Sequence, residues 1–348
     1  MLVVRLGALG DILRTLPPVR LLRRALPRAT IHWVLEEKWA GVLRDHPDLN
    51  GLLPMPRERW RRSVRAPTGW PGLIRSIREF RAALRECGAG LVLDFHGNLR
   101  SGWTSRLSGA PVRIGYAGHQ QKEGNRSFNT HHVASGVRRT PRMERNLDLI
   151  RALRLPDRPL PPAELPMVAA GASRAAEIES SLGRPDTPFA VISPGASRAQ
   201  AHKKPPASLL SAASRRLARD GVASLVVWGP GEEQDATRVT DEPASEAKLA
   251  PPTDLPTLAA LLARARLFVG GDSGPLHLAC AVGCPVVGIY GPTDPVVNSP
   301  WGVPYRTVAP EDRSYTGIKR LDRRAGGFDG LHPTRIERSL TELLAETG

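Results

Sequence analysis

The chain has 348 residues, of which 41% are hydrophobic and 24% are charged, which excludes a fibrous or a disordered protein. This length is sufficient for two globular domains, each with its own core. The formal net charge of +15 is unevenly distributed, because residues 1–150 contain 26 Lys and Arg against 12 Asp and Glu, whereas residues 151–348 contain 23 against 22. The basic first half predicts an anionic partner, such as nucleic acid, a phosphorylated glycolipid or a membrane surface. Solvated arginines that reflect codon usage are the plainer alternative.

Three cysteines, Cys87, Cys280 and Cys284, are too few for a disulfide scaffold, and the last two lack a second pair with which to form a zinc site. The sequence has no apolar run of about 18 residues, the length that a membrane-spanning helix needs. Gly7 and Asp11 interrupt the N-terminal segment too early for a signal peptide. We therefore expect a cytoplasmic protein without a metal centre.

Apolar strands alternate with amphipathic helices along the chain, which predicts α/β structure with parallel sheets. In the first half we expect strands at 2–6, 30–35 and 90–95 and helices at 12–25 and 72–86. Five prolines between residues 155 and 166 exclude regular structure and indicate an interdomain linker. Beyond the linker we expect strands at 189–193, 223–228, 267–270 and 286–290, and helices at 207–219, 255–263, 276–282 and 334–345. The pattern predicts two doubly wound domains in series.

The loop after the first predicted strand, Gly7-Ala-Leu-Gly10-Asp11, is a candidate site, because ligands of open α/β sheets bind at the carboxyl ends of the strands. Its two glycines allow the backbone to turn tightly close to a ligand. Asp11 can either cap the helix that follows or act as a general base, and the local residues leave both roles open. The glycine spacing matches neither a dinucleotide fingerprint nor a Walker A loop.

A second candidate loop, residues 193–206, combines a Pro-Gly turn with the Ser197 hydroxyl and two cations, Lys203 and Lys204. Backbone amides, a hydroxyl and a lysine together can hold a phosphate. An ordinary solvated basic loop is the alternative.

A third loop, Gly271-Asp272-Ser273-Gly274, lies where a strand is expected to end and a helix to begin. Ser273 can cap the helix, Gly274 admits close approach of a ligand, and the helix N-terminus attracts an anion. His277 follows one turn into the helix. The alternative is a capped helix with a buried, satisfied histidine.

In this order, the loops resemble those of the heptosyltransferase family of lipopolysaccharide-core glycosyltransferases. The resemblance covers most of the chain and rests on R-x-G-x-x-G-D-x-x-x-T-x-P at residues 5–17, a P-G-A-x-x loop leading to Lys203, and G-D-S-G-x-x-H at residues 271–277. It implies the GT-B fold, with two Rossmann-like, doubly wound domains facing across a cleft. It also implies an acceptor domain at 1–154, a linker at 155–166, a donor domain at 167–333, and a closing helix at 334–348 that packs back on the first domain.

The resemblance implies an inverting transfer of heptose from ADP-L-glycero-D-manno-heptose to the Kdo-lipid A inner core, with Asp11 as general base and Gly10 beside the acceptor. Residues that would bind the donor are Ser197, Lys203, Glu232, Asp272, Ser273, Gly274 and His277. Such a transferase needs no metal ion or other cofactor, because a lysine, hydroxyls and helix-terminal amides can stabilise the leaving diphosphate. The expected partners are the donor, the anionic glycolipid and the cytoplasmic face of the inner membrane, and not nucleic acid.

This chain departs from the family pattern at two places. Ala196-Ser197 stands where some members have two threonines, and Gly231 stands where a ribose-binding Glu is expected, with Glu232 and Glu233 beside it. Which of the two carboxylates contacts the ribose stays open. So do the alternatives of a sister transferase that adds the second heptose or uses another nucleotide-sugar, a nucleotide-sugar epimerase, and a non-catalytic nucleic-acid-binding module.

A dense basic segment in the first half contains Arg57, Arg59, Arg61, Arg62 and Arg65, with Trp60 among them. The resemblance indicates that these arginines contact the acceptor, whose phosphates and carboxylates suit guanidinium groups. A solvated loop and a nucleic-acid patch are the alternatives. The same interpretation extends to Arg100, Arg106, Arg113 and Lys122.

Overall fold

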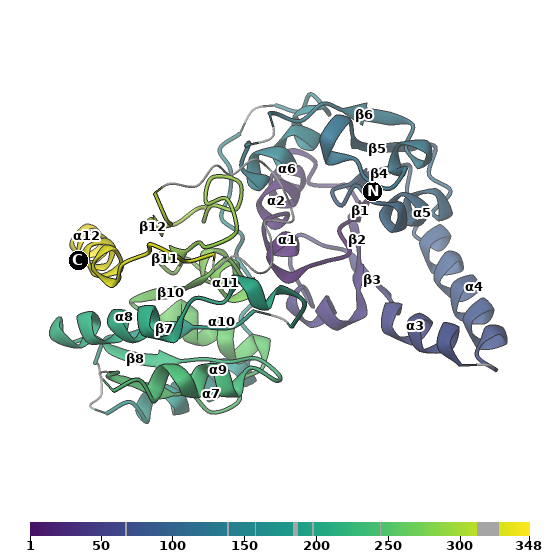
Figure 1. The fold of residues 1–348 in the computed structure, drawn as a ribbon. Helices are drawn as coiled ribbons and strands as arrows, with labels where there is room; N and C mark the ends of the chain where they lie inside the picture. The colour runs from purple at the N-terminus through teal and green to yellow at the C-terminus, as the bar shows by residue number, and fades with distance from the viewer. Residues whose placement is uncertain are drawn as a thin grey trace. The chain divides into compact units, whose positions relative to one another are not determined.

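The computed structural model describes residues 1–66, 68–137, 139–156, 158–183, 187–196, 198–243, 245–311 and 327–348. The chain divides into two units, Met1–Pro166 and Met167–Gly348, so the boundary falls at the end of the predicted linker. Each unit is built on one six-stranded sheet with helices packed against it (Figure 1).

The first sheet is parallel throughout, with the strand order β3-β2-β1-β4-β5-β6. Its strands are β1 (Leu2–Val4), β2 (His32–Glu36), β3 (Gly51–Met55), β4 (Leu91–Asp94), β5 (Val112–Tyr116) and β6 (His131–Val133). The strand order reverses between β1 and β4, where Val4 is in register with Asp94. A crevice for ligands is expected at the carboxyl ends of these two strands.

The helices of the first unit are α1 (Leu9–Leu13), α2 (Leu16–Ala25), α3 (Arg57–Arg65), α4 (Trp70–Glu86), α5 (Leu99–Leu107) and α6 (Arg142–Arg151), with 3-10 turns η1 (Glu37–Val42), η2 (Gly118–Gln120) and η3 (Asn125–Phe128). The helix predicted at 12–25 is in fact two helices, because Pro17 and Pro18 lack the amide that a continuous helix would use and fit only the first turn of α2. The basic segment forms α3 rather than a loop.

The second sheet has the order β12-β11-β10-β7-β8-β9 and is also parallel. Its strands are β7 (Phe189–Ser193), β8 (Ala223–Val226), β9 (Ala247–Leu249), β10 (Leu267–Gly271), β11 (Val286–Ile289) and β12 (Tyr305–Val308). Its helices are α7 (Ala169–Ser180), η4 (Arg198–Lys203), α8 (Ala207–Arg219), α9 (Glu233–Thr240), α10 (Leu255–Arg264), α11 (Gly274–Ala281) and α12 (Pro333–Thr347). The reversal lies between β7 and β10, so the two sheets share one topology.

The closing helix α12 packs within the second unit, against α8, β11 and β12. Ile336, Leu340 and Leu343 form its apolar stripe and are fully buried in a cluster with Leu217 of α8 and Val308 of β12. The apolar stripe of α12 therefore completes the core of the second unit. That this helix also packs on the first domain stays a prediction.

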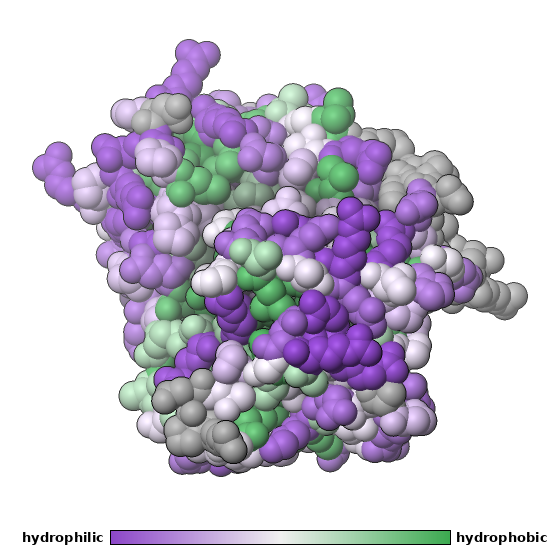
Figure 2. Space-filling view, turned by 90° about the vertical axis from the view of Figure 1, so that its left-hand side faces the viewer, coloured by the Kyte–Doolittle hydropathy of each residue, from purple (hydrophilic) through white to green (hydrophobic). Residues whose placement is uncertain are grey.

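The apolar residues of each unit gather around its sheet. In the first unit, Leu2, Val4 and Val92 of the central strands pack with Phe80 and Leu84 of α4. On the face that Figure 2 shows, hydrophilic residues surround smaller hydrophobic areas. Among the described residues, no helix combines the length and the apolar character needed to cross a membrane.

Candidate active site

Asp11 lies within α1, directly after β1 and at the reversal of the first sheet. The N-cap position of α1 is Ala8, so the capping role considered for Asp11 is wrong. The carboxylate is 21% exposed and contacts three guanidinium groups. Arg5 Nη2 lies 2.6 Å from Oδ2, while the Nη1 atoms of Arg14 and Arg142 each lie 3.2 Å from Oδ1.

Two opposing effects act on the ionisation of Asp11. Burial by itself would raise the pKa, but the charges of Arg5, Arg142 and Arg14 outweigh it and hold the pKa of Asp11 well below its usual range. Asp11 is therefore a carboxylate at neutral pH, ready to accept a hydrogen bond or a proton from a hydroxyl. The arginines also weaken its basicity, so any anion that draws one of them away makes Asp11 a stronger base.

A buried hydrogen-bond network fixes the turn that carries Asp11. Thr15 Oγ1 donates to the Asp11 carbonyl at 2.8 Å, and Asn146 Nδ2 donates to the Arg14 carbonyl at 3.0 Å and to Thr15 Oγ1 at 3.2 Å. Tyr116 Oη donates to Asn146 Oδ1 at 3.0 Å. The threonine of the N-terminal motif thus holds the helix turn in place.

The end of β4 supplies a second polar group beside Asp11. Arg5 donates to the carbonyl of Phe95, and the next residue, His96, is held by a bond from its amide to Asp94 Oδ1 at 2.9 Å. Burial and the nearby charge of Arg5 lower the pKa of His96 to about 3, so its imidazole is neutral at pH 7. Burial raises the pKa of Asp94, although bonds from Asn125, Gly97 and Ser101 oppose this shift.

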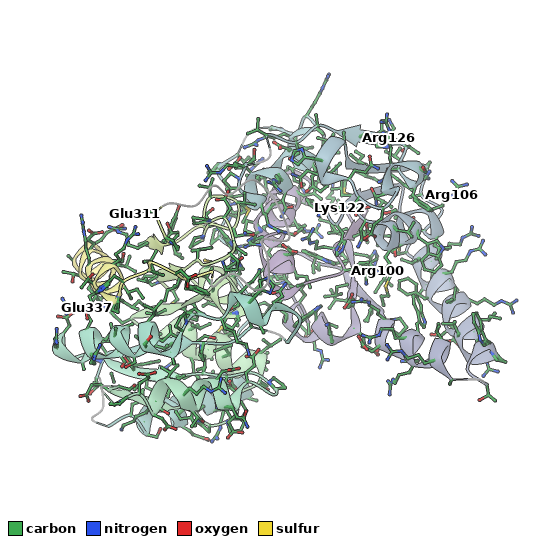
Figure 3. The ribbon with its side chains drawn as sticks, in the orientation of Figure 1. Arg100, Arg106, Lys122, Arg126, Glu311 and Glu337 are labelled. Atoms are coloured by element: carbon green, nitrogen blue, oxygen red, sulfur yellow. The ribbon has the colours of Figure 1, made fainter. Side chains whose placement is uncertain are left out.

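Glu36, at the end of β2, gathers a second set of cations. Its buried carboxylate lies 2.7 Å from Arg57, 3.0 Å from Arg100 and 3.7 Å from Lys38. The Glu36 amide donates to the Leu6 carbonyl at 2.9 Å, which places this set beside the loop that leads to Asp11. Figure 3 marks Arg100 on this unit. The carboxyl edge of the first sheet therefore carries more positive than negative charge.

The other predicted acceptor residues are placed differently. Arg59 and Arg61 are exposed on α3 and pair with Glu37 at 3.5 Å and Glu58 at 3.4 Å, Arg62 is exposed, and Gly10 is buried inside α1. Of the four arginines, the structure thus brings Arg57 into direct contact with Glu36.

Trp60 does not present its ring for stacking on a base. It packs edge to face against Phe80 and Trp103, with ring centroids 5.4 and 6.1 Å away. Its indole donates to Ser76 Oγ at 2.9 Å. The interpretation of this segment as a nucleic-acid patch therefore lacks the aromatic ring that would stack on a base.

At the reversal of the second sheet, Asp272 follows β10 and organises two of the predicted donor residues. Lys203 Nζ lies 3.1 Å from Asp272 Oδ2, and His277 Nε2 lies 3.4 Å from Oδ1. All three side chains are at most 18% exposed. A Cβ added at Gly271 would lie 2.9 Å from the Lys203 carbonyl, so the glycine admits the close approach of the lysine loop.

Ser273 occupies the N-cap position of α11 in extended backbone, but its hydroxyl does not cap the helix. Within the described ranges, its buried Oγ has no hydrogen-bond partner. Gly274 begins the helix behind it. A hydroxyl and free helix amides at one point form a binding place for an anionic group.

Glu232 connects the loops after β7 and β8. Its Oε2 accepts a bond from the Gly229 amide at 3.2 Å, and a Cβ added at Gly195 would lie 2.2 Å from the same oxygen. Any larger residue at position 195 would therefore displace the Glu232 carboxylate. Glu233 is exposed as the first residue of α9, and Ser197 lies outside the described residues.

Residues 77–323 match the model of glycosyltransferase family 9 (heptosyltransferase). The chain belongs to this family. Lipopolysaccharide heptosyltransferase 1 of Pseudomonas aeruginosa is 27% identical over 304 residues, which cover 86% of this chain and 81% of the relative. Lipopolysaccharide heptosyltransferase 3 of Escherichia coli is 27% identical over 300 residues, which cover 84% and 82%.

Solved structures show the same fold. A family 9 glycosyltransferase from Veillonella parvula has a TM-score of 0.81 at 21% identity, over 99% of this chain and 97% of that one. The Escherichia coli heptosyltransferase WaaC with ADP has a TM-score of 0.75 at 23% identity, over 98% and 99%. The predicted fold class, α/β with two Rossmann-like, doubly wound domains of the GT-B type, is confirmed, and the chain is a glycosyltransferase.

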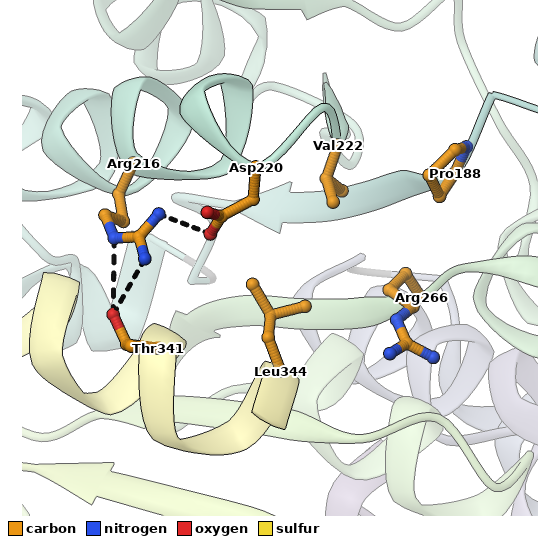
Figure 4. Close-up of a pocket in the computed structure, with 7 residues that line it drawn as sticks. All are labelled: Pro188, Arg216, Asp220, Val222, Arg266, Thr341 and Leu344. Carbon is orange, nitrogen blue, oxygen red and sulfur yellow. Dashed lines mark hydrogen bonds and ion pairs between the residues drawn. The ribbon is translucent and has the colours of Figure 1, made fainter. Parts of the chain in front are cut away.

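A pocket of this glycosyltransferase lies away from the candidate site. It has a volume of about 330 Å³ and is formed between α8 and α12 (Figure 4). Pro188, Val222 and Arg266 line it, and each of them precedes a strand. The pocket is therefore at the amino edge of the second sheet, opposite the loops expected to bind the donor. In the part of the chain that the structure describes, no group of three or more His, Cys, Asp or Glu side chains could hold a metal ion.

Several residues of the site are absent from our sequence-based predictions. Arg5 and Arg14 flank Asp11 closely in the sequence, so their spacing could have indicated them. Arg142 is 131 residues from Asp11, and Glu36 carries no motif. Only the fold brings these last two to the site.

Proposed function

We propose that this family 9 member is a heptosyltransferase of the lipopolysaccharide core. It transfers L-glycero-D-manno-heptose from ADP-L-glycero-D-manno-heptose to the Kdo-lipid A inner core, with inversion and without a metal ion. The names of relatives support this proposal, since heptosyltransferase 1 is 27% identical over most of the chain. One structural neighbour is WaaC with ADP-2-deoxy-2-fluoro heptose. The reaction would take place at the cytoplasmic face of the inner membrane, where this chain acts as a peripheral protein.

The observation that carries the proposal is the ionised Asp11 carboxylate at the reversal of the first sheet. Asp11 takes the proton of the acceptor hydroxyl while the hydroxyl oxygen forms a bond to the anomeric carbon of the donor. The bond between that carbon and the diphosphate oxygen breaks, and ADP leaves with the electron pair. A single displacement of this kind inverts the configuration at the anomeric carbon.

The second unit supplies the groups that hold the leaving diphosphate. The Lys203 cation, the unpartnered Ser273 hydroxyl and the amides at Gly274 can stabilise its negative charge. Asp272 positions Lys203 and His277. Ser197 is proposed to bind the same phosphates and Glu232 or Glu233 the ribose.

The cations of the first unit suit the acceptor. Arg57 and Arg100 are held in place by Glu36, and Arg142 is the most exposed of the three arginines on Asp11, at 38%. Phosphates or carboxylates of the glycolipid can pair with these groups. Gly10, Arg59, Arg61 and Arg62 complete the proposed acceptor region.

The Asp11→Asn variant tests the mechanism, because the substitution removes the base and keeps the side-chain shape. We expect turnover to fall by about 100- to 10,000-fold, the usual contribution of a general base. ADP-heptose binding, measured by calorimetry, should stay within about twofold, because the donor residues lie on the other unit. Asp45→Asn, at an exposed position, is the matched control. Unchanged turnover in the Asp11 variant would overturn the mechanism.

A sister transferase that adds another heptose or uses another nucleotide-sugar is the second candidate. The equal identity to heptosyltransferase 3 supports it. A panel of ADP-, UDP- and GDP-sugars, each with Kdo-lipid A bearing or lacking the first heptose, separates the two. Consumption of a non-ADP donor alone excludes the first candidate, and consumption of a donor without any acceptor indicates an epimerase.

A further inference from the structure

Helices α3 and α4 form a hairpin that extends away from the first sheet (Figure 1). One side of the hairpin is accounted for by packing. Leu73, Phe80 and Leu84 of α4 are buried, and Phe80 and Leu84 belong to the core of the first unit. Trp60 of α3 packs against Phe80 and thereby joins the two helices.

The tip of the hairpin has apolar side chains that this core does not cover. Val64, near the end of α3, is 54% exposed, and Trp70 and Ile74, at the start of α4, are 57% and 47% exposed. Trp70 and Ile74 are four residues apart and so lie on one face of the helix. Large apolar side chains exposed together on a protein surface mark an interaction site.

The same hairpin carries a strong excess of positive charge. Residues 57–86 contain nine arginines and three glutamates. Exposed arginines that form no ion pair in the described parts of the chain are Arg62, Arg65, Arg75, Arg78 and Arg81. By contrast, Arg338 on α12 pairs with Glu342 at 2.9 Å. The hairpin thus presents uncompensated guanidinium groups around an apolar tip.

We propose that the tip of the α3–α4 hairpin, formed by Val64, Trp70 and Ile74 with the surrounding arginines, is a docking surface for an anionic phospholipid bilayer. Tryptophan and aliphatic side chains insert at the boundary between headgroups and acyl chains, while basic residues bind anionic headgroups. Charge complementarity selects this partner, because a second copy of the tip would bring like charges together.

The role of this docking surface rests on the proposed function, because an enzyme that modifies a glycolipid must reach its substrate at a bilayer. The base of the hairpin adds a structural link. Helix α3 begins at Arg57, whose guanidinium binds Glu36 at the carboxyl edge of the first sheet. A hairpin anchored in lipid therefore holds the proposed acceptor edge close to the membrane surface.

Flotation of the full chain with vesicles tests the docking surface without donor or acceptor, so its outcome is independent of the transferase assay. Vesicles of phosphatidylethanolamine with phosphatidylglycerol are compared with vesicles of phosphatidylcholine, at low and high salt. We expect binding to the anionic vesicles alone, weakened by salt because the arginines contribute through charge.

Two variants separate the apolar and the charged contributions. Trp70→Ser with Ile74→Ser, and separately Arg75→Gln with Arg78→Gln, should each weaken vesicle binding by about tenfold or more. Met167→Ser, at a side chain as exposed as Ile74 at 47%, and Arg338→Gln, at an arginine 83% exposed, should leave binding unchanged. Thermal melting shows that each variant is folded, which is expected because the substituted residues are exposed.

Three results would overturn the proposal. The first is that the unaltered chain does not bind anionic vesicles. The second is that the Trp70 and Ile74 substitutions leave vesicle binding intact. The third is that sedimentation shows a dimer that these substitutions dissociate. The last result would make the tip an interface between two copies of this chain.

Discussion

The carboxyl edges of the two sheets share one strand order but differ in electrostatics. In the first unit, Asp11 is bound by three arginines and Glu36 by two arginines and a lysine. In the second unit, Asp272 is bound by one lysine and one histidine, beside an open hydroxyl and a helix N-terminus. Figure 3 marks Arg106 and Arg126 on the first unit and Glu311 and Glu337 on the second. The same topology thus carries an excess of cations at the carboxyl edge of the first sheet. At the second sheet, the edge has only a few positioned groups, namely a lysine, a hydroxyl and helix amides.

Beyond the Asp11 variant, the largest expected effect concerns the second edge. Lys203→Met removes the cation beside Asp272, and we expect kcat/KM to fall by about 100-fold, because a preorganised charge on the leaving group is lost. The loss should appear in kcat/KM when the donor concentration is varied, while KM for the acceptor stays unchanged. Lys248→Met, on β9, is the control. An equal change in both KM values would mean that the two edges do not divide the substrates as proposed.

The assignment of α12 to the second unit predicts a large effect on stability. Leu340→Ala creates a cavity at a fully buried position and should cost about 3 kcal/mol of unfolding free energy. Hydrogen exchange should accelerate in α8 and β12 and remain unchanged in the first sheet. Accelerated exchange in β1 or β4 would contradict this assignment.

His96, on the first edge, should make the stability of the chain depend on pH. The pKa of His96 is lowered to about 3 in the folded protein, so between pH 6.5 and 3 only the unfolded chain binds a proton there. The free energy of unfolding therefore decreases as the pH falls through this window. At pH 4.5 the loss due to His96 is about 2.5 kcal/mol. Denaturant unfolding of His96→Gln should show a smaller loss between pH 7 and pH 4.5 than the unaltered chain. An equal loss would show that the His96 imidazole is protonated in the folded state.

The smallest expected effect concerns the positioning of cations on the first edge. Glu36→Gln removes the charge that holds Arg57 and Arg100, so KM for the acceptor should rise by about tenfold, the effect of one weakened ion pair. KM for the donor should not change. Glu86→Gln, at an exposed position of α4, provides the control. A rise in donor KM would point to a general structural role for Glu36.

The parts of the fold that could be predicted are those in which apolar pattern and local breakers agree. The buried strand β7 and the amphipathic helix α8 begin and end where the sequence indicates. Strand β3 escaped prediction because it contains Pro54 and lies at a sheet edge, where a missing amide is tolerated. Helix α3 escaped because it has no buried face, so no apolar period reveals it.

By itself the sequence determined the two α/β halves and the glycine loops at the strand ends that carry Asp11, Lys203 and Asp272, because strand periodicity and turn residues are local properties. Only the tertiary structure decided that Arg142 reaches Asp11 across 131 residues of chain and that α12 belongs to the second core. Ion pairs between distant segments and the choice of a packing partner depend on where the strands lie in the sheets, which no local pattern records.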